Sequence, residues 1–356
     1  MPEFPFLITP AGLAARLGDD GLCVIDCRFD LGDPARGRRE FEAGHIPCAV
    51  YADLDRDLAG PVRPDTGRHP LPDPQVFAET LGRWAVGRDS DVVALHDCDI
   101  VTYTREMLAR LIYPVANPAF SYLFCKGFYA RYAGGKMNGR VNRLLVSPLL
   151  LSLSKTIGHR DYLTYLAAFR YPLAGEFAMR TAILPDIRIP SDWGLEIGVL
   201  SEVWRNLSTR LVCQVEIADA YDHKHQPLSE EDPQAGLSRM STDICKAIYR
   251  KLATDGTIFS QETFRTIKAT YYREALDMIE AYHNDARMNG LHIDRHVEER
   301  AVELFASNIV EAGQTFLDNP METPFIPNWS RVQAADPDLM RDLLEAVKAD
   351  EAEFGG

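Results

Sequence analysis

The sequence predicts an α/β fold followed by a helical C-terminal part, and three observations support this prediction. Two short apolar runs, Leu22–Asp26 and Asp91–Leu95, have the length and the unalternating pattern of strands that are buried on both faces of a parallel sheet. Between these runs apolar residues recur at helical spacing, so strands and helices are expected to alternate. From Ser241 onward the apolar pattern is helical almost throughout.

The first helix is expected to begin at Asp73 and Pro74, because aspartate is a favoured N-cap and proline is tolerated in the first turn. Gly87 is expected to end it. Residues 56–74, before this helix, are rich in Pro, Gly and Asp and are predicted to be a loop. The apolar face of the helix is formed by Phe77, Leu81 and Trp84.

Downstream of the second strand, helical spacing covers Tyr103–Ile112, and strand patterns cover Phe120–Phe124 and Arg210–Glu216. The longest helix is predicted over Ser260–Asn289, and Asp294 is expected to cap the next one. The long helix has an apolar stripe that must pack on the sheet or on a second subunit, so a homodimer is one expectation. The stripe consists of Phe264, Ile267, Tyr271, Ala275, Ile279 and Tyr282.

The chain of 356 residues is acidic, with 38 Lys and Arg against 52 Asp and Glu and a net charge of −14. A nucleic-acid partner is not expected, because such partners bind to cationic surfaces. The most apolar run, Val146–Leu153, is far shorter than the ~20 residues that span a bilayer. The N-terminus lacks the basic region of a secretory signal, so we expect no membrane association.

The cysteine content predicts a cytoplasmic protein. The seven cysteines are odd in number and contain no CxxC pair, so neither a disulfide framework nor a structural zinc site is expected. Reduced thiols are typical of the cytoplasm.

Three N-terminal pieces occur together, namely Val24–Arg28 (VIDCR), Phe41–Val50 (FEAGHIPCAV) and Asp53–Leu58. Their order and spacing resemble a rhodanese-like (sulfurtransferase) domain over about residues 6–94. One departure is Cys48, which stands where that family usually has glycine. If this position takes a positive φ, the Cβ of a cysteine costs about 1–2 kcal/mol.

The resemblance implies sulfur transfer by a low-pKa cysteine in a loop that follows a later strand. The candidate at that place is Cys98, which lies between Asp97 and Asp99. Two neighbouring carboxylates raise the pKa of a thiol, so Cys98 is expected to be a poor sulfur carrier. Cys23 and Cys27 are expected to be inert thiols in a buried strand.

Asp97 and Asp99 directly follow an apolar strand, so their carboxylates are expected at the edge of a sheet where α/β proteins bind ligands. Two carboxylates at one edge can hold Mg²⁺ or Mn²⁺, and such an ion neutralises a diphosphate. Taken alone, the pair is a weak signal, because short acidic turns are common, so the neighbouring motifs decide between the two interpretations.

Together with the aspartate pair, five further blocks resemble the retaining glucosyl-3-phosphoglycerate synthases, which are glycosyltransferases of GT-A fold. The resemblance extends over about residues 91–323. The blocks, in chain order, are Lys126–Tyr129, Asn138–Val141, Tyr171–Phe177, Trp193–Gly198 and Asp222–Leu228.

The resemblance implies roles for individual residues. Arg140 offers a planar fork that suits phosphate or carboxylate, and Gly139 beside it permits close approach of the backbone. The implied metal ligands are Asp97, Asp99 and His223, the implied catalytic residues are Glu196 and Arg140, and the implied substrate-binding residues are Lys126, Gly139, Arg140, Asn142, Gly175, Glu176 and His225. Structural interpretations stay open for Glu196 as a surface strand residue, Lys126 as a rim charge and the two histidines as surface groups.

The implied function is metal-dependent transfer of a hexose, with retention of configuration, from a nucleotide sugar of the UDP-glucose type to a 3-phosphoglycerate-like acceptor. His225 and Asn142 stand where close relatives are expected to have asparagine and threonine, so the identity of the acceptor is open. The family's first portion, which binds the nucleotide, has no counterpart before Asp97.

We therefore interpret the chain as a chimera of three parts: a rhodanese-like segment without its active loop (residues 1–94), a GT-A-like domain without its nucleotide-binding half (95–325) and a helical tail (326–356). Donor affinity is expected to be impaired. The alternatives are a sulfurtransferase relative and a non-catalytic, vestigial protein.

Overall fold

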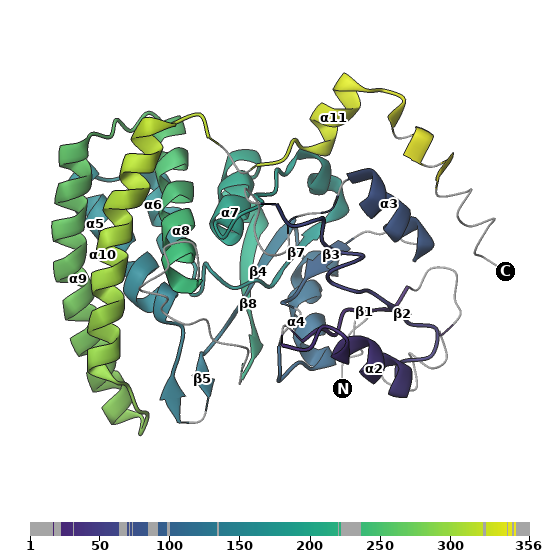
Figure 1. Ribbon diagram of the computed structural model, residues 1–356, viewed down its shortest axis with the longest axis horizontal. Coiled ribbons are helices and arrows are strands. Elements are labelled where there is room, and N and C mark those ends of the chain that lie inside the picture. The colour runs from purple at the N-terminus through teal and green to yellow at the C-terminus, as the bar shows by residue number, and fades with distance from the viewer. Residues whose placement is uncertain are drawn as a thin grey trace.

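The computed structural model shows long helices packed side by side at one end of the molecule (Figure 1). A sheet lies at the centre of the molecule, and shorter helices lie around it and toward the other end. The structure describes residues 17, 23–30, 32–63, 70, 72, 74–84, 92–97, 100–133, 135–219, 221, 236–322, 325–339, 341–343 and 345–346.

The N-terminal elements form a small α/β unit. They are β1 (Ile25–Asp26), α2 (Arg36–Ala43), β2 (Val50–Tyr51) and α3 (Pro74–Arg83). The two strands pair in parallel. The start of α2 lies so close to this pair that a Cβ at Gly37 would stand 1.9 Å from the carbonyl oxygen of Arg28. The hydroxyl of Tyr51 donates to the same oxygen at 3.0 Å, so the carbonyl ties strand and helix together.

Cys48 has a φ of 65° and is the one non-glycine residue with positive φ in the described part of the chain. This confirms that the position has the backbone conformation that favours glycine.

A four-stranded sheet lies at the centre of the molecule, in the order β3 (Val92–Leu95), β7 (Phe177–Arg180), β4 (Phe124–Tyr129) and β8 (Val212–Ala218). Strand β7 is antiparallel to both of its neighbours, and β4 is parallel to β8. The prediction of a fully buried parallel strand at 91–95 is therefore wrong. An unalternating apolar run indicates apolar surroundings but not strand direction, and Leu95 is 38% exposed.

Strands β1 and β2 form a separate two-stranded sheet, so among the described residues β3 is an edge of the central sheet. Helix α4 (Arg105–Ala116) packs against all four strands of the central sheet. Its apolar side and the sheet share a buried cluster that includes Met107, Leu111, Val115, Cys125, Ala178 and Ile217.

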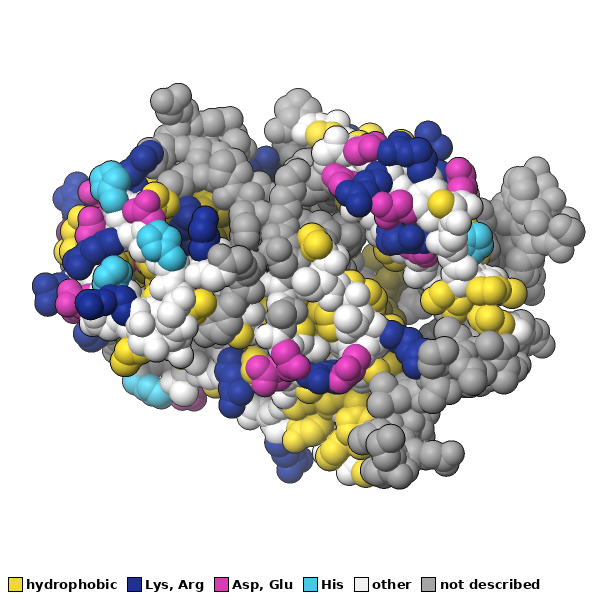
Figure 2. All heavy atoms as spheres, turned by 90° about the horizontal axis from the view of Figure 1, so that it is seen from below, with side chains coloured by type: hydrophobic (Ala, Val, Ile, Leu, Met, Phe, Trp, Pro, Cys, Tyr) yellow, Lys and Arg dark blue, Asp and Glu magenta, His cyan; other side chains and the backbone are white. Residues whose placement is uncertain are grey.

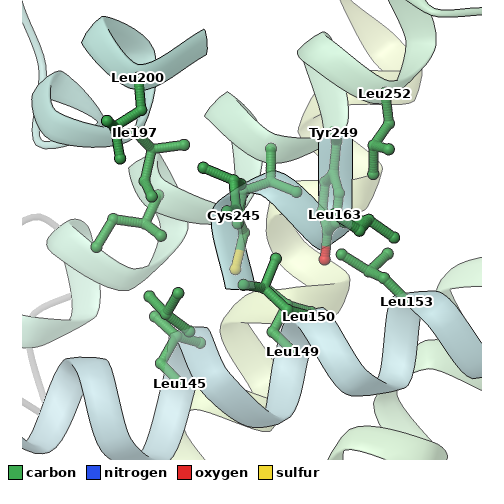
Figure 3. Close-up of a cluster of buried hydrophobic side chains, with 14 of the residues drawn as sticks. Leu145, Leu149, Leu150, Leu153, Leu163, Ile197, Leu200, Cys245, Tyr249 and Leu252 are labelled. Carbon is green, nitrogen blue, oxygen red and sulfur yellow. The ribbon is translucent and has the colours of Figure 1, made fainter. Parts of the chain in front are cut away.

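A second, larger core joins the sheet to the helical region, and Figure 3 shows part of it, where leucines of α5 meet side chains of α7 and α8. The helices are a π-helical turn η1 (Asn142–Val146), α5 (Ser147–Ile157), α6 (Asp161–Ala167), α7 (Leu195–Asn206), α8 (Gly236–Thr254), α9 (Gln261–Met288) and α10 (Arg295–Asp318).

Both predicted helix starts in this region are confirmed. The side chain of Ser260 accepts a hydrogen bond from the backbone N–H of Thr263 at 3.2 Å, and that of Asp294 accepts one from Val297 at 3.2 Å. These bonds satisfy N–H groups that lack partners inside the helix. The predicted stripe of α9 is buried from Phe264 to Ile279, while Tyr282 is half-buried.

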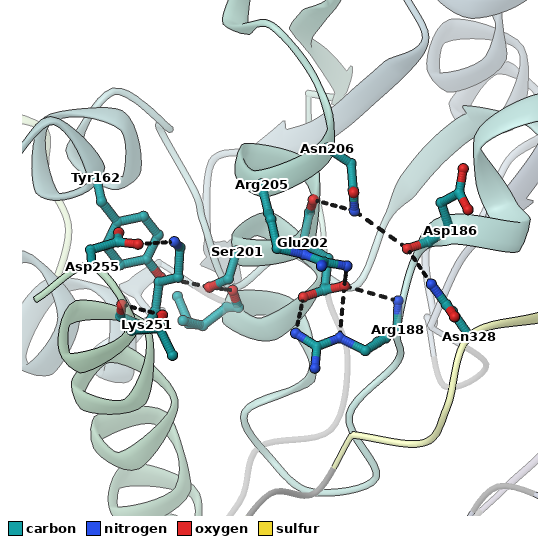
Figure 4. A network of polar contacts seen from close by, with 12 residues as sticks. Tyr162, Asp186, Arg188, Ser201, Glu202, Arg205, Asn206, Lys251, Asp255 and Asn328 are labelled. Atoms are coloured by element: carbon teal, nitrogen blue, oxygen red, sulfur yellow. Dashed lines mark hydrogen bonds and ion pairs between the residues drawn. The ribbon is translucent and has the colours of Figure 1, made fainter. Parts of the chain in front are cut away.

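Shorter elements complete the fold: β5 (Tyr132–Ala133), β6 (Lys136–Met137), the 3₁₀ turns η2 (Thr181–Asp186) and η3 (Thr209–Leu211), and α11 (Trp329–Ala335). Figure 4 shows the polar network that fixes α7. The buried carboxylate of Glu202 accepts from Arg188 at 2.6 Å and from Arg205 at 2.9 Å. Asn328 donates to the carbonyl of Asp186 at 3.1 Å, which attaches the C-terminal segment to the body.

Two strand boundaries differ from prediction. The run Phe120–Phe124 lies mostly outside the sheet: a short turn precedes it, in which the N–H of Phe120 donates to the carbonyl of Asn117 at 3.1 Å, and the strand begins only at Phe124. The run Arg210–Glu216 begins in η3, so strand β8 starts at Val212.

Figure 2 shows the face seen from below, where Lys and Arg side chains are interspersed with Asp and Glu. Across the described residues, no helix combines the length and the apolar character needed to span a bilayer.

Candidate active site

Eight of the eleven predicted site residues can be located. Asp99, His223 and His225 lie outside the described residues. The located ones are Asp97, Lys126, Gly139, Arg140, Asn142, Gly175, Glu176 and Glu196. They form two groups: an acidic cluster around Lys126 at the sheet, and a basic turn at Gly139 and Arg140 that leads into η1.

Asp97 follows β3 and packs directly on Gly175. A Cβ at Gly175 would stand 2.0 Å from a carboxylate oxygen of Asp97, so the absence of a side chain at 175 makes room for that carboxylate. The structure thereby brings a predicted metal ligand against a predicted substrate-binding residue that lies far away in the sequence.

Lys126 lies in β4 and is 1% exposed. Its Nζ donates to the carbonyl of Ala174 and lies 5.5 Å from the centroid of the Phe177 ring. Burial lowers the pKa of Lys126 to about 8, although the carboxylates of Glu196, Glu176 and Asp97 oppose this shift. Lys126 is thus not a rim charge. The charges of three carboxylates act on it from its surroundings.

Glu176 is fully buried next to Lys126, and its side chain accepts a hydrogen bond from the hydroxyl of Tyr221. The Tyr221 ring stacks on Tyr129 with centroids 3.5 Å apart and planes 4° from parallel. Burial raises the pKa of Tyr221, and the Glu176 carboxylate raises it further, so the phenol remains a donor. Tyr221 is the last described residue before the segment that contains His223, and its bond to Glu176 holds it in place.

Glu196 lies in the first turn of α7, so its interpretation as a strand residue is wrong. A Gly-Leu-Glu-Ile-Gly run carries no helical period, and this left the helix unrecognised. Burial raises the pKa of Glu196, while the Lys126 ammonium lowers it. A carboxylate in the first turn of a helix also faces the positive end of the helix dipole.

The basic turn depends on Gly139, whose φ is +74°, and a Cβ there would stand 3.3 Å from Cγ of Arg131. The neighbouring Arg140 is half-buried, and burial lowers the pKa of its guanidinium, while the Glu298 carboxylate raises it. The amide oxygen of Asn142 is buried and has no hydrogen-bond partner among the described residues. These groups present donors and a positive charge on one turn.

The structure also shows site-forming residues that the sequence did not reveal. Arg143 in η1 and Glu298 on α10 form a buried ion pair, with 2.5 Å between Nη2 and Oε1. Tyr221 was also missed, although it directly precedes a block that the sequence did single out. Glu298 had no such signal, because it lies 155 residues from Arg143.

The metal site is described only in part. Among the described residues no three His, Cys, Asp or Glu side chains form a group that could hold an ion. Of the three predicted ligands only Asp97 is among those residues. The complete predicted set, two carboxylates and one imidazole, has the donor chemistry that suits Mn²⁺ or Mg²⁺.

Two N-terminal thiols are unsuited to sulfur transfer. Their prediction as thiols in a buried strand is wrong, because both lie just outside β1 and are exposed. Partial loss of solvation and, to a smaller extent, the Asp26 carboxylate raise the pKa of Cys27 to about 11. Partial loss of solvation also raises the pKa of Cys23, whose Sγ donates to the carbonyl of Trp84 at 2.7 Å. Both are protonated at neutral pH, whereas a sulfur carrier requires a thiolate. Cys98 lies outside the described residues.

A pocket of about 360 Å³ lies elsewhere, where α6 and α7 meet β8. Tyr165, Phe169 and Trp204 are among the residues that line it. None of the predicted site residues does, so this pocket is separate from the candidate site.

Comparison with known proteins identifies the larger part of the chain. A search of family models gives no match. The glucosyl-3-phosphoglycerate synthase of Persephonella marina is 43% identical over 274 residues, which cover 77% of this chain and 68% of that protein. The chain belongs to the glucosyl-3-phosphoglycerate synthase family. The enzyme of the same name from Methanococcoides burtonii is 43% identical over 270 residues, and 66% of its length is covered. The chain thus spans about two thirds of these family members.

The N-terminal resemblance is confirmed as well. A probable 3-mercaptopyruvate sulfurtransferase of Pseudomonas aeruginosa is 52% identical over 92 residues, which cover 26% of this chain and 32% of that protein. The predicted fold class, a rhodanese-like segment joined to part of a GT-A glycosyltransferase, is therefore correct. Only a third of the sulfurtransferase is represented in the chain.

Solved structures of the family resemble the chain more loosely. One is glucosyl-3-phosphoglycerate synthase from Mycobacterium tuberculosis in complex with Mn²⁺, UDP-glucose and phosphoglyceric acid. It is 22% identical, with a TM-score of 0.42, and the match covers 62% of this chain and 65% of that one.

Proposed function

We propose that this protein is a metal-dependent retaining glycosyltransferase that transfers a hexose from a nucleotide sugar to a 3-phosphoglycerate-like acceptor. Family membership supports the reaction type. The observation that carries the proposal is the packing of the Asp97 carboxylate on the bare backbone of Gly175, next to the fully buried Glu176 and near the buried Lys126. Such a cluster at a strand end is the expected place for a sugar diphosphate and its ion.

The proposed roles follow from charge and position. Asp97, with Asp99 and His223, holds Mg²⁺ or Mn²⁺, and the ion when bound neutralises the diphosphate. Lys126 opposes the rise that burial gives to the pKa of Glu196, because a nearby cation stabilises a carboxylate. An ionised Glu196 can accept a hydrogen bond from a hydroxyl of the sugar or of the acceptor.

The second group of residues binds the acceptor in this proposal. Arg140 donates to its phosphate or carboxylate, and the bare Gly139 lets that group approach the backbone. Asn142 is the first residue of η1, and its amide oxygen, which has no partner among the described residues, can accept a hydrogen bond from a hydroxyl of the acceptor. His225 completes the predicted acceptor set.

Glu176 has a supporting role. Its side chain is fully buried and bonded to Tyr221, so it acts on the substrate site through Tyr221 and Lys126. It was predicted to bind substrate. Because it is bonded to Tyr221, we propose instead that it holds Tyr221 in place.

We propose a low donor affinity. The chain spans about two thirds of its relatives, and β1 and β2 pair with each other rather than with β3. The first strands of a GT-A sheet contribute the nucleotide pocket. A rhodanese-like segment in their place is not expected to supply the side chains that bind the base and the ribose. We keep the proposed division at residues 94 and 325, a cytoplasmic location and a possible homodimer as parts of this proposal.

A transfer assay tests the function. The protein is incubated with UDP-glucose, 3-phosphoglycerate and Mn²⁺, and the glucosylated acceptor is detected by mass spectrometry. We expect slow product formation that stops with EDTA and in Asp97→Asn. The matched control is Asp219→Asn, an exposed aspartate at the end of β8. Absence of product with every nucleotide sugar would favour the vestigial alternative.

A sulfurtransferase is the second candidate, favoured by the 52% identity over 92 residues. A thiosulfate:cyanide assay distinguishes it. We expect no activity above background, because the thiols of Cys23 and Cys27 are protonated at neutral pH. Activity that is lost in Cys98→Ser would establish this candidate instead.

A further inference from the structure

The turn at Gly139 and Arg140 is held by a contact from the far end of the chain. Arg143, one helical turn on, donates from its backbone N–H to the carbonyl of Gly139 at 3.0 Å and from Nε to the carbonyl of Asn138 at 2.9 Å. Its Nη2 then pairs with Glu298 of α10 at 2.5 Å. The Arg143 guanidinium therefore links one carbonyl of the turn, that of Asn138, to α10, while the backbone N–H of Arg143 bonds the other.

This ion pair is too buried and too poorly satisfied to be explained by stability alone. Arg143 is 8% exposed and Glu298 4%. Within the described residues, Nη1 of Arg143 and Oε2 of Glu298 have no hydrogen-bond partners. A buried pair with unsatisfied atoms is often no more stabilising than an apolar pair of equal volume. The pair does impose a geometry, because Arg143 joins the turn at Asn138 to α10.

The turn has one more positive charge than the neighbouring carboxylate can neutralise. Arg140 and Arg143 bring two positive charges to the turn, and Glu298 brings one negative charge that Arg143 already engages. Within the described residues Arg140 forms no hydrogen bond or ion pair. One guanidinium therefore remains for an anionic ligand in a protein whose net charge is −14.

The backbone conformation of the turn also indicates a binding site. Gly139 has a φ of +74°, and the helix that starts at Arg140 passes at once into the π-helical turn η1. Single π-helical turns are rare in proteins, and those that occur are often found at functional sites. Arg143 is the side chain that links this turn to α10, and its guanidinium also lies 4.8 Å from the Tyr282 ring centroid on α9.

We propose that Glu298, through Arg143, is a positioning residue that directs Arg140 toward the anionic group of the acceptor and thereby sets the preference for a phosphorylated acceptor. This rests on the proposed function. The acceptor is a small carboxylic acid that bears a phosphate, and Glu298 does not touch it.

Calorimetric binding of 3-phosphoglycerate, with no donor present, tests the proposal apart from catalysis. We expect Glu298→Gln to weaken binding about tenfold or more, the order of loss caused by misplacing a binding group. In the transfer assay the same variant raises KM for 3-phosphoglycerate and leaves KM for UDP-glucose unchanged. The matched control is Glu299→Gln, the next residue of α10, which forms an exposed pair with Arg295 at 2.9 Å.

A double variant separates positioning from folding. Arg143→Met with Glu298→Leu replaces the ion pair by apolar side chains and is expected to keep the wild-type unfolding midpoint. Its affinity for 3-phosphoglycerate should nevertheless fall as far as in Glu298→Gln. Wild-type affinity in the double variant or in Glu298→Gln would overturn the proposal while leaving the proposed function intact. Failure of the proposed function would appear differently, as absence of both binding and transfer in the wild type, and would remove this proposal with it.

Discussion

Replacing Cys48 with glycine should stabilise the protein, because Cys48 is held at a φ of 65°. Removing the Cβ from a left-handed residue relieves about 1–2 kcal/mol. Glycine is more flexible in the unfolded chain, which costs roughly 0.5–1 kcal/mol. The net expectation for Cys48→Gly is a gain of roughly 0–1.5 kcal/mol in the free energy of unfolding, centred at about 0.7 kcal/mol.

Urea unfolding followed by tryptophan fluorescence measures this gain, and the buried Trp84 reports on the N-terminal unit. The midpoint should rise with no change in the slope m, since the unfolded surface is the same. Cys48→Ala is the control: it removes the thiol, keeps the Cβ and should not stabilise. An equal gain in Cys48→Ala, or a loss in Cys48→Gly, would refute the reasoning from backbone strain.

Three further predictions concern the acidic cluster. Folding lowers the pKa of Lys126 from 10.5 to about 8, so the unfolded chain binds more protons between these values and wild-type stability should rise across that pH range; urea titrations at pH 7.5 and 9.5 should show a smaller rise in Lys126→Met, and an identical rise would contradict the shift. Gly175→Ala should displace the carboxylate of Asp97 and lower Mn²⁺-dependent transfer about tenfold or more, while unchanged transfer would mean that the contact does not matter. Tyr221→Phe should destabilise by about 1–3 kcal/mol, because the buried Glu176 loses its hydrogen-bond donor; thermal unfolding measures this, and an unaltered midpoint would count against the bond.

The sequence predicted well where local chemistry decides the outcome. Ser260 and Asp294 cap their helices through their own side chains, and the stripe of α9 follows from helical periodicity. Cys48 was recognised because a family pattern indicated glycine there, and the backbone has the matching φ.

Long-range pairing was predicted poorly, and each failure has a physical reason. The apolar run of β3 indicates burial but contains no information on the antiparallel partner β7. Glu196 lies in a helix that was not predicted, because the glycines on either side of it interrupt the helical pattern of apolar residues. The candidate site was predicted as a set of residues, but the role of Glu298 could not be, because only the folded chain brings α10 against η1.

Binding of UDP-glucose in the presence of Mn²⁺, measured by calorimetry on the wild type and on Asp97→Asn, tests the central claim most directly. If the carboxylate against Gly175 helps to hold an ion for a sugar diphosphate, binding to the wild type should require Mn²⁺, should be weak, and should vanish in Asp97→Asn. Binding that is indifferent to Mn²⁺ or to this substitution would contradict the claim.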